Sequence, residues 1–273
     1  NEADDEKKGL ELGAIDYITK PISPAIVLAR VKTHLALKSS ADFLRDKSAY
    51  LEREVALRTL EVQAIQDVTI MAMASLAETR DDETGNHIRR TQLYVKALAE
   101  RLRSHPRFEA VLSSRMIELL YKSAPLHDIG KIGVADHLLL KPGKLTESEF
   151  DAVKQHSRLG RKAIESAERR LGMRVPFLNV AKEMACSHHE CWDGAGYPEG
   201  LAGDAIPVPA RLMALADVYD AIISQRGYKS AGTHEQACVA IVKGRGTQFD
   251  PDMVDAFIDI AEEFRSIAQR FPD

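Results

Sequence analysis

One stretch of the chain, from Leu37 to about Ile70, contains neither proline nor glycine, and charged residues are interspersed throughout it. Because nothing in it breaks a helix, this stretch predicts a single long helix. One seam of a heptad repeat, with a charged break, consists of Leu37, Leu44, Leu51, Arg58 and Ile65. The other seam consists of Ala41, Ser48, Val55, Val62 and Thr69. We expect residues 36–70 to be a linker helix that forms a homodimer by parallel coiled-coil pairing; a helix packed on its own domain is the alternative.

Composition limits the classes of function that the chain can have. Its 273 residues can form one large domain or two smaller ones. The proportions of hydrophobic residues (45%) and charged residues (29%) are typical of a globular protein with a sizeable core. The net charge of -4 does not suggest nucleic-acid binding, and no apolar run approaches the length of a membrane span. The charged first residues do not resemble a signal peptide. An odd number of cysteines (Cys186, Cys191 and Cys238) favours a reduced, cytoplasmic location. We therefore expect neither a nucleic-acid partner nor a membrane.

From residue 71 to residue 273, apolar residues recur at helical spacing in one segment after another. Thr146 and Glu149 form the signature of a capping box at the start of one such segment. Alternating runs of β-branched residues are missing, so this part predicts an all-α bundle. The long segment "WDGAGYPEGLAGDAIPVP" interrupts the bundle, and a loop of that length in a compact domain usually has a function.

Histidines and carboxylates recur on separate predicted helices of this bundle. The candidates are Glu83 with His87, His127 with Asp128, His156, His188 with His189, and Asp217 with Asp220. Each alone has a simpler explanation, such as a satisfied core histidine, a surface pair or a capped helix end. Together they favour a polynuclear metal site, because carboxylates bridge ions and imidazoles complete the coordination. A structural zinc site using Cys186 and Cys191 is the alternative, but it needs only four ligands and would leave the other residues unexplained.

The first 35 residues predict a helix end at Gly13, a short strand over Ala14–Thr19, and a helix from about Pro24. The run "GAIDYITKP" resembles the last strand and helix of a response-regulator receiver domain. This resemblance implies that residues 1–35 are the end of a regulatory domain in two-component signalling, on which a sensor kinase acts. The aspartate that accepts the phosphoryl group would then lie upstream. An unrelated βα unit is the alternative.

The runs "HDIGK" and "HHECWDGAGYP" resemble the signature of the HD-GYP family of the HD phosphohydrolase superfamily. So do "LLLKPGKLTESEF", "KQHSRLG", "ARLMALADVYDA" and "GTQFDP", so that the resemblance covers roughly residues 68–273. It implies an all-α HD-domain bundle over residues 71–273 that hydrolyses the bacterial messenger cyclic di-GMP to pGpG, GMP or both. A metal-activated water would act at a centre of two or three divalent ions. Nitrogen and oxygen ligands without thiolate suit iron or manganese, with nickel or zinc as alternatives.

The resemblance also implies roles for particular residues. The implied metal ligands are Glu83, His87, His127, Asp128, His156, His188, His189 and Asp217. Asp128 is expected to bridge two ions, and Lys131 to face a phosphoryl oxygen of the substrate. The implied substrate contacts are Arg226, Lys229, Gly196, Tyr197 and Pro198, although Gly227 stands where the family often has proline. Two alternatives remain: a slow or inactive cyclic di-GMP sensor, and a hydrolase of another cyclic dinucleotide.

Overall fold

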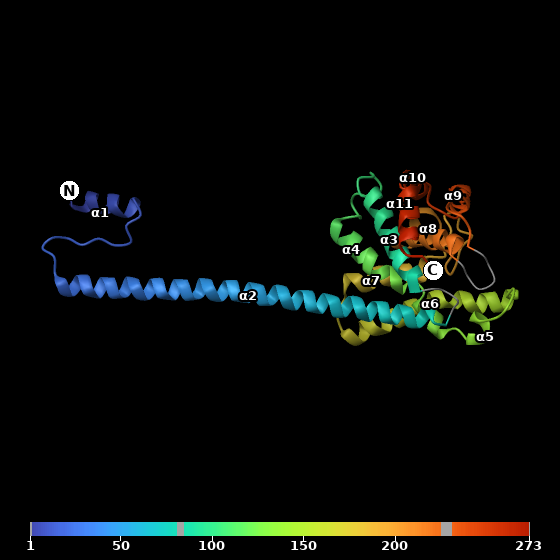
Figure 1. Cartoon of the computed structure of the whole chain (residues 1–273), viewed down its shortest axis with the longest axis horizontal. Coiled ribbons are helices and arrows are strands. Elements are labelled where there is room, and N and C mark those ends of the chain that lie inside the picture. Colours follow the sequence, from blue (N-terminus) through green and yellow to red (C-terminus); the bar gives the residue numbers. More distant parts are fainter. Residues whose placement is uncertain (1, 81–84, 225–230, 273) are drawn as a thin grey trace. The chain divides into compact units, whose positions relative to one another are not determined.

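The regular structure of the chain is helical (Figure 1). A computed structural model describes residues 2–80, 85–224 and 231–272, and no strand occurs among them. The predicted all-α class is thereby confirmed. The chain divides into two compact units, residues 1–64 and 65–273. The three-part division into residues 1–35, 36–70 and 71–273 stays a prediction.

In the first unit, α1 (Glu2–Glu11) is followed by an irregular connection that leads into α2 (Pro24–Glu78), whose residues from Ile65 onward belong to the second unit. Gly13 ends the first helix with a φ of 96°, a conformation that glycine adopts without strain. The predicted strand over Ala14–Thr19 is wrong: these residues have no strand beside them to complete a ladder. Instead, the carboxylate of Asp16 binds Arg30 and lies 3.0 Å from Nε2 of His34. The resemblance to a receiver domain, and with it the kinase, stays a prediction.

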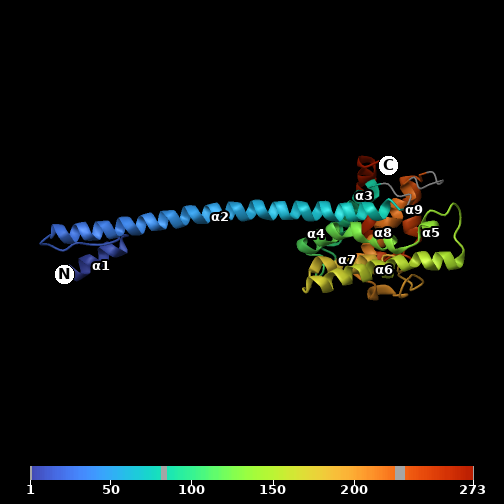
Figure 2. The same ribbon diagram turned by 90° about the horizontal axis from the view of Figure 1, so that it is seen from below.

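The long helix predicted between Leu37 and Ile70 is confirmed, since α2 continues without a break through 55 residues (Figure 1 and Figure 2). Its first residue is Pro24, which suits the first helical position because an amide hydrogen is not needed there. The side chains of Leu37, Leu44 and Leu51 are exposed. Coiled-coil pairing along this seam stays a prediction.

The second unit contains the remaining helices. They are α3 (Gly85–Leu102), α4 (Ser114–Ser123), η1 (Ala124–Leu126), η2 (Ile129–Gly133), α5 (Asp136–Leu139), α6 (Glu147–Leu171), α7 (Pro176–Ser187), η3 (Gly203–Ala205), α8 (Val208–Ile223), α9 (His234–Lys243), α10 (Pro251–Asp259) and α11 (Ala261–Arg270). The capping box of α6 is formed as predicted: the amide of Thr146 donates to Oε2 of Glu149 at 2.7 Å, and the amide of Glu149 donates back to Oγ1 of Thr146 at 3.3 Å. In the part of the chain with described coordinates, no helix is both long enough and apolar enough to cross a bilayer.

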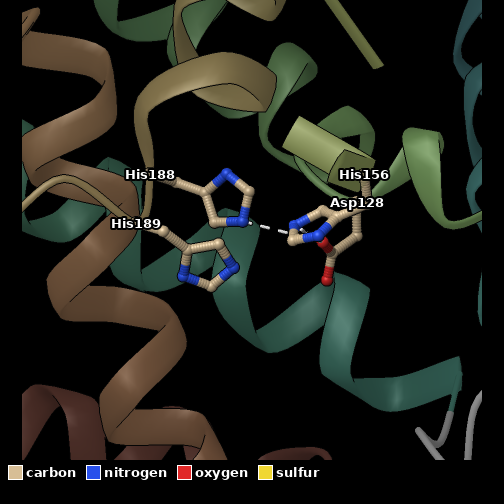
Figure 3. Close-up of side chains that lie close together, drawn as sticks. All are labelled: Asp128, His156, His188 and His189. Atoms are coloured by element: carbon tan, nitrogen blue, oxygen red, sulfur yellow. Dashed lines mark ion pairs between the residues drawn. The ribbon is translucent and has the colours of Figure 1, made fainter. Parts of the chain in front are cut away.

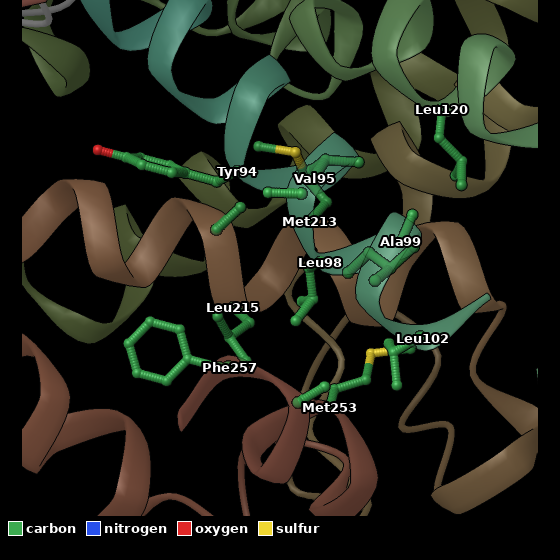
Figure 4. Close-up of a cluster of buried hydrophobic side chains, with 14 of the residues drawn as sticks. Tyr94, Val95, Leu98, Ala99, Leu102, Leu120, Met213, Leu215, Met253 and Phe257 are labelled. Atoms are coloured by element: carbon green, nitrogen blue, oxygen red, sulfur yellow. The ribbon is translucent and has the colours of Figure 1, made fainter. Parts of the chain in front are cut away.

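The larger hydrophobic core lies where α3, α8 and α10 meet (Figure 4). Leu98 of α3, Leu215 of α8 and Phe257 of α10 are each fully buried in it. A second, smaller core contains the last turns of α2 together with η1, η2, α6 and α7. There, Ile70 and Ala77 pack with Ile129 and Ala181. The short η1–η2 segment is therefore held in place by apolar contacts, and this segment contains His127 and Asp128.

Candidate metal centre

Seven of the eight predicted ligands lie in two adjacent groups. One group is Asp128, His156, His188 and His189, and the other is His87, His127 and Asp217. Within each group, the candidate ligand atoms all lie within 4.8 Å of one another. Figure 3 shows the rings of His188 and His189 facing His156 and the carboxylate of Asp128. The two groups adjoin, because Nε2 of His127 lies 3.2 Å from Oδ2 of Asp128.

A close crossing of η2 over α6 brings Asp128 and His156 together. A Cβ atom on Gly130 would lie 1.9 Å from the carbonyl oxygen of His156 and 2.5 Å from the amide nitrogen of Gly160. Both atoms belong to the backbone of α6, so only glycine allows this approach. The glycine of "HDIGK" therefore sets the distance between the two segments that carry these ligands.

Three of the imidazoles are oriented by the backbone of their own segments. Nδ1 of His127 lies 2.8 Å from the carbonyl oxygen of Ala124, and Nδ1 of His156 lies 2.8 Å from that of Val153. Nδ1 of His188 lies 2.9 Å from the carbonyl oxygen of Met184. Because a carbonyl oxygen only accepts, each Nδ1 must carry the proton and donate it. The Nε2 lone pair of each ring is then turned toward the other ligands, as metal binding requires.

His87 is held by a carboxylate instead of a carbonyl. Its Nδ1 lies 2.8 Å from Oδ2 of the fully buried Asp220, which also accepts from Nε of Arg90 at 2.7 Å. Burial acts to raise the pKa of Asp220, but the hydrogen bonds from His87 and Arg90 prevail and lower it to about 2. Carboxylate support behind a ligating histidine is a common arrangement at metal sites. The sequence singled out Asp217 and Asp220 together, but only Asp217 was expected to be a ligand, and neither the supporting role of Asp220 nor that of Arg90 was predicted.

The carboxylate of Asp128 lies between the imidazoles. Oδ1 is 3.2 Å from Nε2 of His156 and 3.6 Å from Nε2 of His188, and Oδ2 is 2.9 Å from Nζ of Lys131. Burial acts to raise the pKa of Asp128, but the positive charge of Lys131 and the neighbouring His127 lower it well below its usual value. Asp128 is therefore ionised and can act as a ligand at neutral pH.

Several polar atoms at this place have no hydrogen-bond partner among the described residues. They are Nε2 of His127, Oδ1 of Asp128 and Nε2 of His188, all of which are buried. Leaving such atoms unsatisfied costs about 1–3 kcal/mol each. Divalent ions would satisfy all three at once, so the residues present fit a metal centre. Neither group contains a cysteine, as far as the described residues go, which argues against the structural zinc alternative.

A structured loop packs against His189 of the first group. Tyr197 stacks on His189, with ring centroids 4.7 Å apart, and its amide donates to the carbonyl oxygen of His189 at 3.2 Å. The buried carboxylate of Glu190 accepts from the amides of Glu199 at 2.8 Å and Leu201 at 3.0 Å. A Cβ atom on Gly196 would lie 2.2 Å from the amide nitrogen of Cys191, so this glycine too is required by a close approach. The loop is therefore folded against the residues that follow His189. Sequence reasoning gave no role to Glu190.

Comparison with known proteins assigns the family. The model of the HD domain family matches residues 72–253 of this chain. The chain belongs to the HD domain family. The part matched includes every candidate ligand described above.

Several curated relatives of this HD domain protein come from Vibrio cholerae serotype O1. The chain is 53% identical to a "Probable cyclic di-GMP phosphodiesterase" over 99% of its own length and 61% of that protein. It is 56% identical to a "Cyclic di-GMP phosphodiesterase" over 78% of its length and 43% of that protein. It is also 36% identical to "3'3'-cGAMP-specific phosphodiesterase 2" over 74% of its length and 36% of that protein. The chain thus spans about three fifths or less of these relatives.

Not every predicted site residue of the HD domain can be placed. Glu83, Arg226 and Lys229 lie outside the described residues. Asp217 belongs to the second ligand group, with Oδ1 3.9 Å from Nε2 of His87. Lys131 makes an ion pair with Asp128, and its contact with a substrate phosphate stays a prediction.

Proposed function

We propose that this HD domain protein hydrolyses cyclic di-GMP to pGpG, GMP or both. The observation that carries the proposal is the convergence of His127, His156 and His188 on Asp128, with Nδ1 of each ring already bound to the backbone. The names of the two relatives at 53% and 56% identity supply the substrate.

In this proposal the ligands are the eight residues predicted from the sequence, and the ions are iron or manganese, with nickel or zinc as alternatives. Such ions, when bound, would activate a water molecule and polarise the phosphodiester. Asp128 links the two ligand groups. Lys131, whose ammonium group lies 2.9 Å from Asp128, would stabilise negative charge that develops on a phosphoryl oxygen. Arg226 and Lys229 would bind the phosphates of the substrate. Gly196, Tyr197 and Pro198 would line the substrate-binding site.

A second candidate substrate is 3'3'-cGAMP. It is favoured by the 36% identity to a relative whose name states that specificity. A cyclic di-GMP sensor with little turnover is the other alternative. The ordered arrangement of the seven described ligand side chains supports catalysis over sensing alone.

The test is turnover by protein purified without oxygen and reconstituted with iron or manganese, with its metal content measured by elemental analysis. We expect cyclic di-GMP to be hydrolysed with the higher kcat/KM, and chelation to abolish the activity. Chromatography of the products distinguishes pGpG from GMP. A higher kcat/KM for 3'3'-cGAMP would favour the second candidate. Binding of cyclic di-GMP without turnover, at full metal content, would favour the sensor.

We also propose that the protein is a homodimer through the exposed seam of α2. Leu44 is 63% exposed and Leu51 is 48% exposed, so a second copy of the helix could bury both. The double substitution Leu44→Glu, Leu51→Glu is expected to give a monomer in light scattering, because charges in the seam oppose pairing. Asp46→Lys, which changes an exposed residue off the seam, is the control and should leave the dimer intact. A dimer in the double variant would place the interface elsewhere.

A further inference from the structure

Helix α6 contributes two side chains, Phe150 and Lys154, that metal binding does not use. They lie four residues apart and so share a face of the helix. Both line a cavity of about 350 Å³ that is also lined by His189, Tyr197 and Asp217. The wall made by Phe150 and Lys154 therefore faces the same space as candidate metal ligands from both groups.

The wall combines aromatic faces with a cation. Nζ of Lys154 lies 4.7 Å from the ring centroid of Phe150 and 5.6 Å from that of Tyr197. The Phe150 and Tyr197 rings are 6.4 Å apart and nearly perpendicular, at 79°. Phe150 is 45% exposed, although it is a large apolar side chain. An exposed ring beside a cavity is suited to stacking on a flat, partly apolar ligand such as a nucleobase.

Lys154 already has one partner, since Nζ donates to Oδ1 of Asp151 at 2.8 Å. The side chain of Asp151 is 62% exposed, so this ion pair is weak and accessible to water. An ammonium group has three donors, and one bond to Asp151 leaves two for a ligand. Lys154, which lines the cavity, therefore keeps two donors for acceptors of a ligand there.

The two purines differ at the edge that such a donor would meet. Guanine presents two acceptors, N7 and O6, whereas adenine presents N7 beside the N6 amino group, which is a donor. An ammonium group therefore favours guanine. We propose that Phe150 and Lys154 form a guanine subsite, in which the ring stacks on one base of the substrate and Lys154 donates to its O6 and N7. This inference rests on the proposed function, because it names the part of cyclic di-GMP that this wall binds.

The inference is tested by equilibrium binding to protein treated with a chelator, so that no turnover occurs. Dissociation constants for cyclic di-GMP and cyclic di-AMP are measured by calorimetry. Lys154→Met keeps the length of the side chain. It should raise the dissociation constant for cyclic di-GMP about tenfold and change that for cyclic di-AMP by no more than about twofold. Phe150→Leu should raise both dissociation constants by a similar factor, about fivefold or more, because an aromatic ring stacks on either base.

Two further variants serve as controls. Lys162→Met changes an exposed lysine of the same helix and should alter neither dissociation constant. Lys154→Arg should retain the preference for guanine, since arginine also donates to O6 and N7. Metal content after reconstitution should match the wild type in every variant, which separates base recognition from displacement of the nearby His156.

Some outcomes would overturn the guanine subsite. If Lys154→Met weakened both dinucleotides equally, Lys154 would contact a phosphate, which they share. The inference would also be contradicted if neither dissociation constant changed, or if the Lys154 variants lost metal. Failure of the wild type to hydrolyse cyclic di-GMP, with the difference between the two dissociation constants intact, would overturn the proposed function and leave the subsite standing.

Discussion

Asp128→Ala is expected to abolish hydrolysis of cyclic di-GMP, with a loss of at least about a thousandfold in kcat. The carboxylate is within 3.6 Å of ring nitrogens from His127, His156 and His188, so its removal takes away the group that joins the two ligand sets. Elemental analysis should show fewer ions per chain. The helical signal in circular dichroism should persist, because the larger hydrophobic core does not include Asp128.

The control is Asp259→Ala, which removes a carboxylate that is 51% exposed and paired with Arg101. It should keep wild-type activity and metal content, since surface ion pairs contribute little to stability. Near-normal turnover by Asp128→Ala at full metal content would show that Asp128 is not a ligand. Loss of the helical signal would instead indicate a mainly structural role.

Gly130→Ala should destabilise the bundle through one added methyl group. Its Cβ would lie 1.9 Å from the carbonyl oxygen of His156 and 2.5 Å from the amide nitrogen of Gly160, so η2 and α6 must separate. Overpacking of this kind costs about 3 kcal/mol, which corresponds to a fall of about 6–12 °C in the Tm of the bundle. Metal affinity should fall as well, because the separation moves His156 away from Asp128.

Gly9→Ala is the matched control, because a Cβ at this helical position of α1 meets nothing within 4 Å. It should be neutral or slightly stabilising, since alanine favours a helix over glycine. Thermal unfolding followed by circular dichroism measures both variants. An unchanged Tm for Gly130→Ala would mean that the crossing can relax without cost.

The helices were predicted well because the residues that start, continue or break a helix lie near one another in the sequence. The absence of helix breakers predicted α2, and the Thr146–Glu149 pair predicted the start of α6. The strand over Ala14–Thr19 was predicted wrongly because a strand depends on a neighbour, and the described residues offer none. Local pattern cannot supply that neighbour.

The motifs singled out the seven candidate ligands that the structure brings together, but they did not reveal the residues that support them. Arg90 reads from the sequence as an ordinary charged helical residue. It is buried because Asp220, and the carbonyl oxygen of Phe271 at 2.8 Å, come to it from distant parts of the chain. Glu190 stands within a motif, but its bonds to the amides of Glu199 and Leu201 also could not be predicted, because they depend on how the loop folds back. Such roles depend on tertiary structure.

The backbone bonds to His127, His156 and His188 have a consequence for how ions enter and leave. Each ring is fixed by a carbonyl three or four residues earlier in its own segment, so its rotamer and tautomer are set before any ion arrives. Loading therefore requires little loss of side-chain entropy, which is an ordinary cost of capturing a ligand. Release of an ion would leave the rings in place, because these backbone bonds do not depend on it. With ligands fixed in this way, the ion bound in the proposed centre would depend more on which ions are supplied than on any rearrangement of the protein.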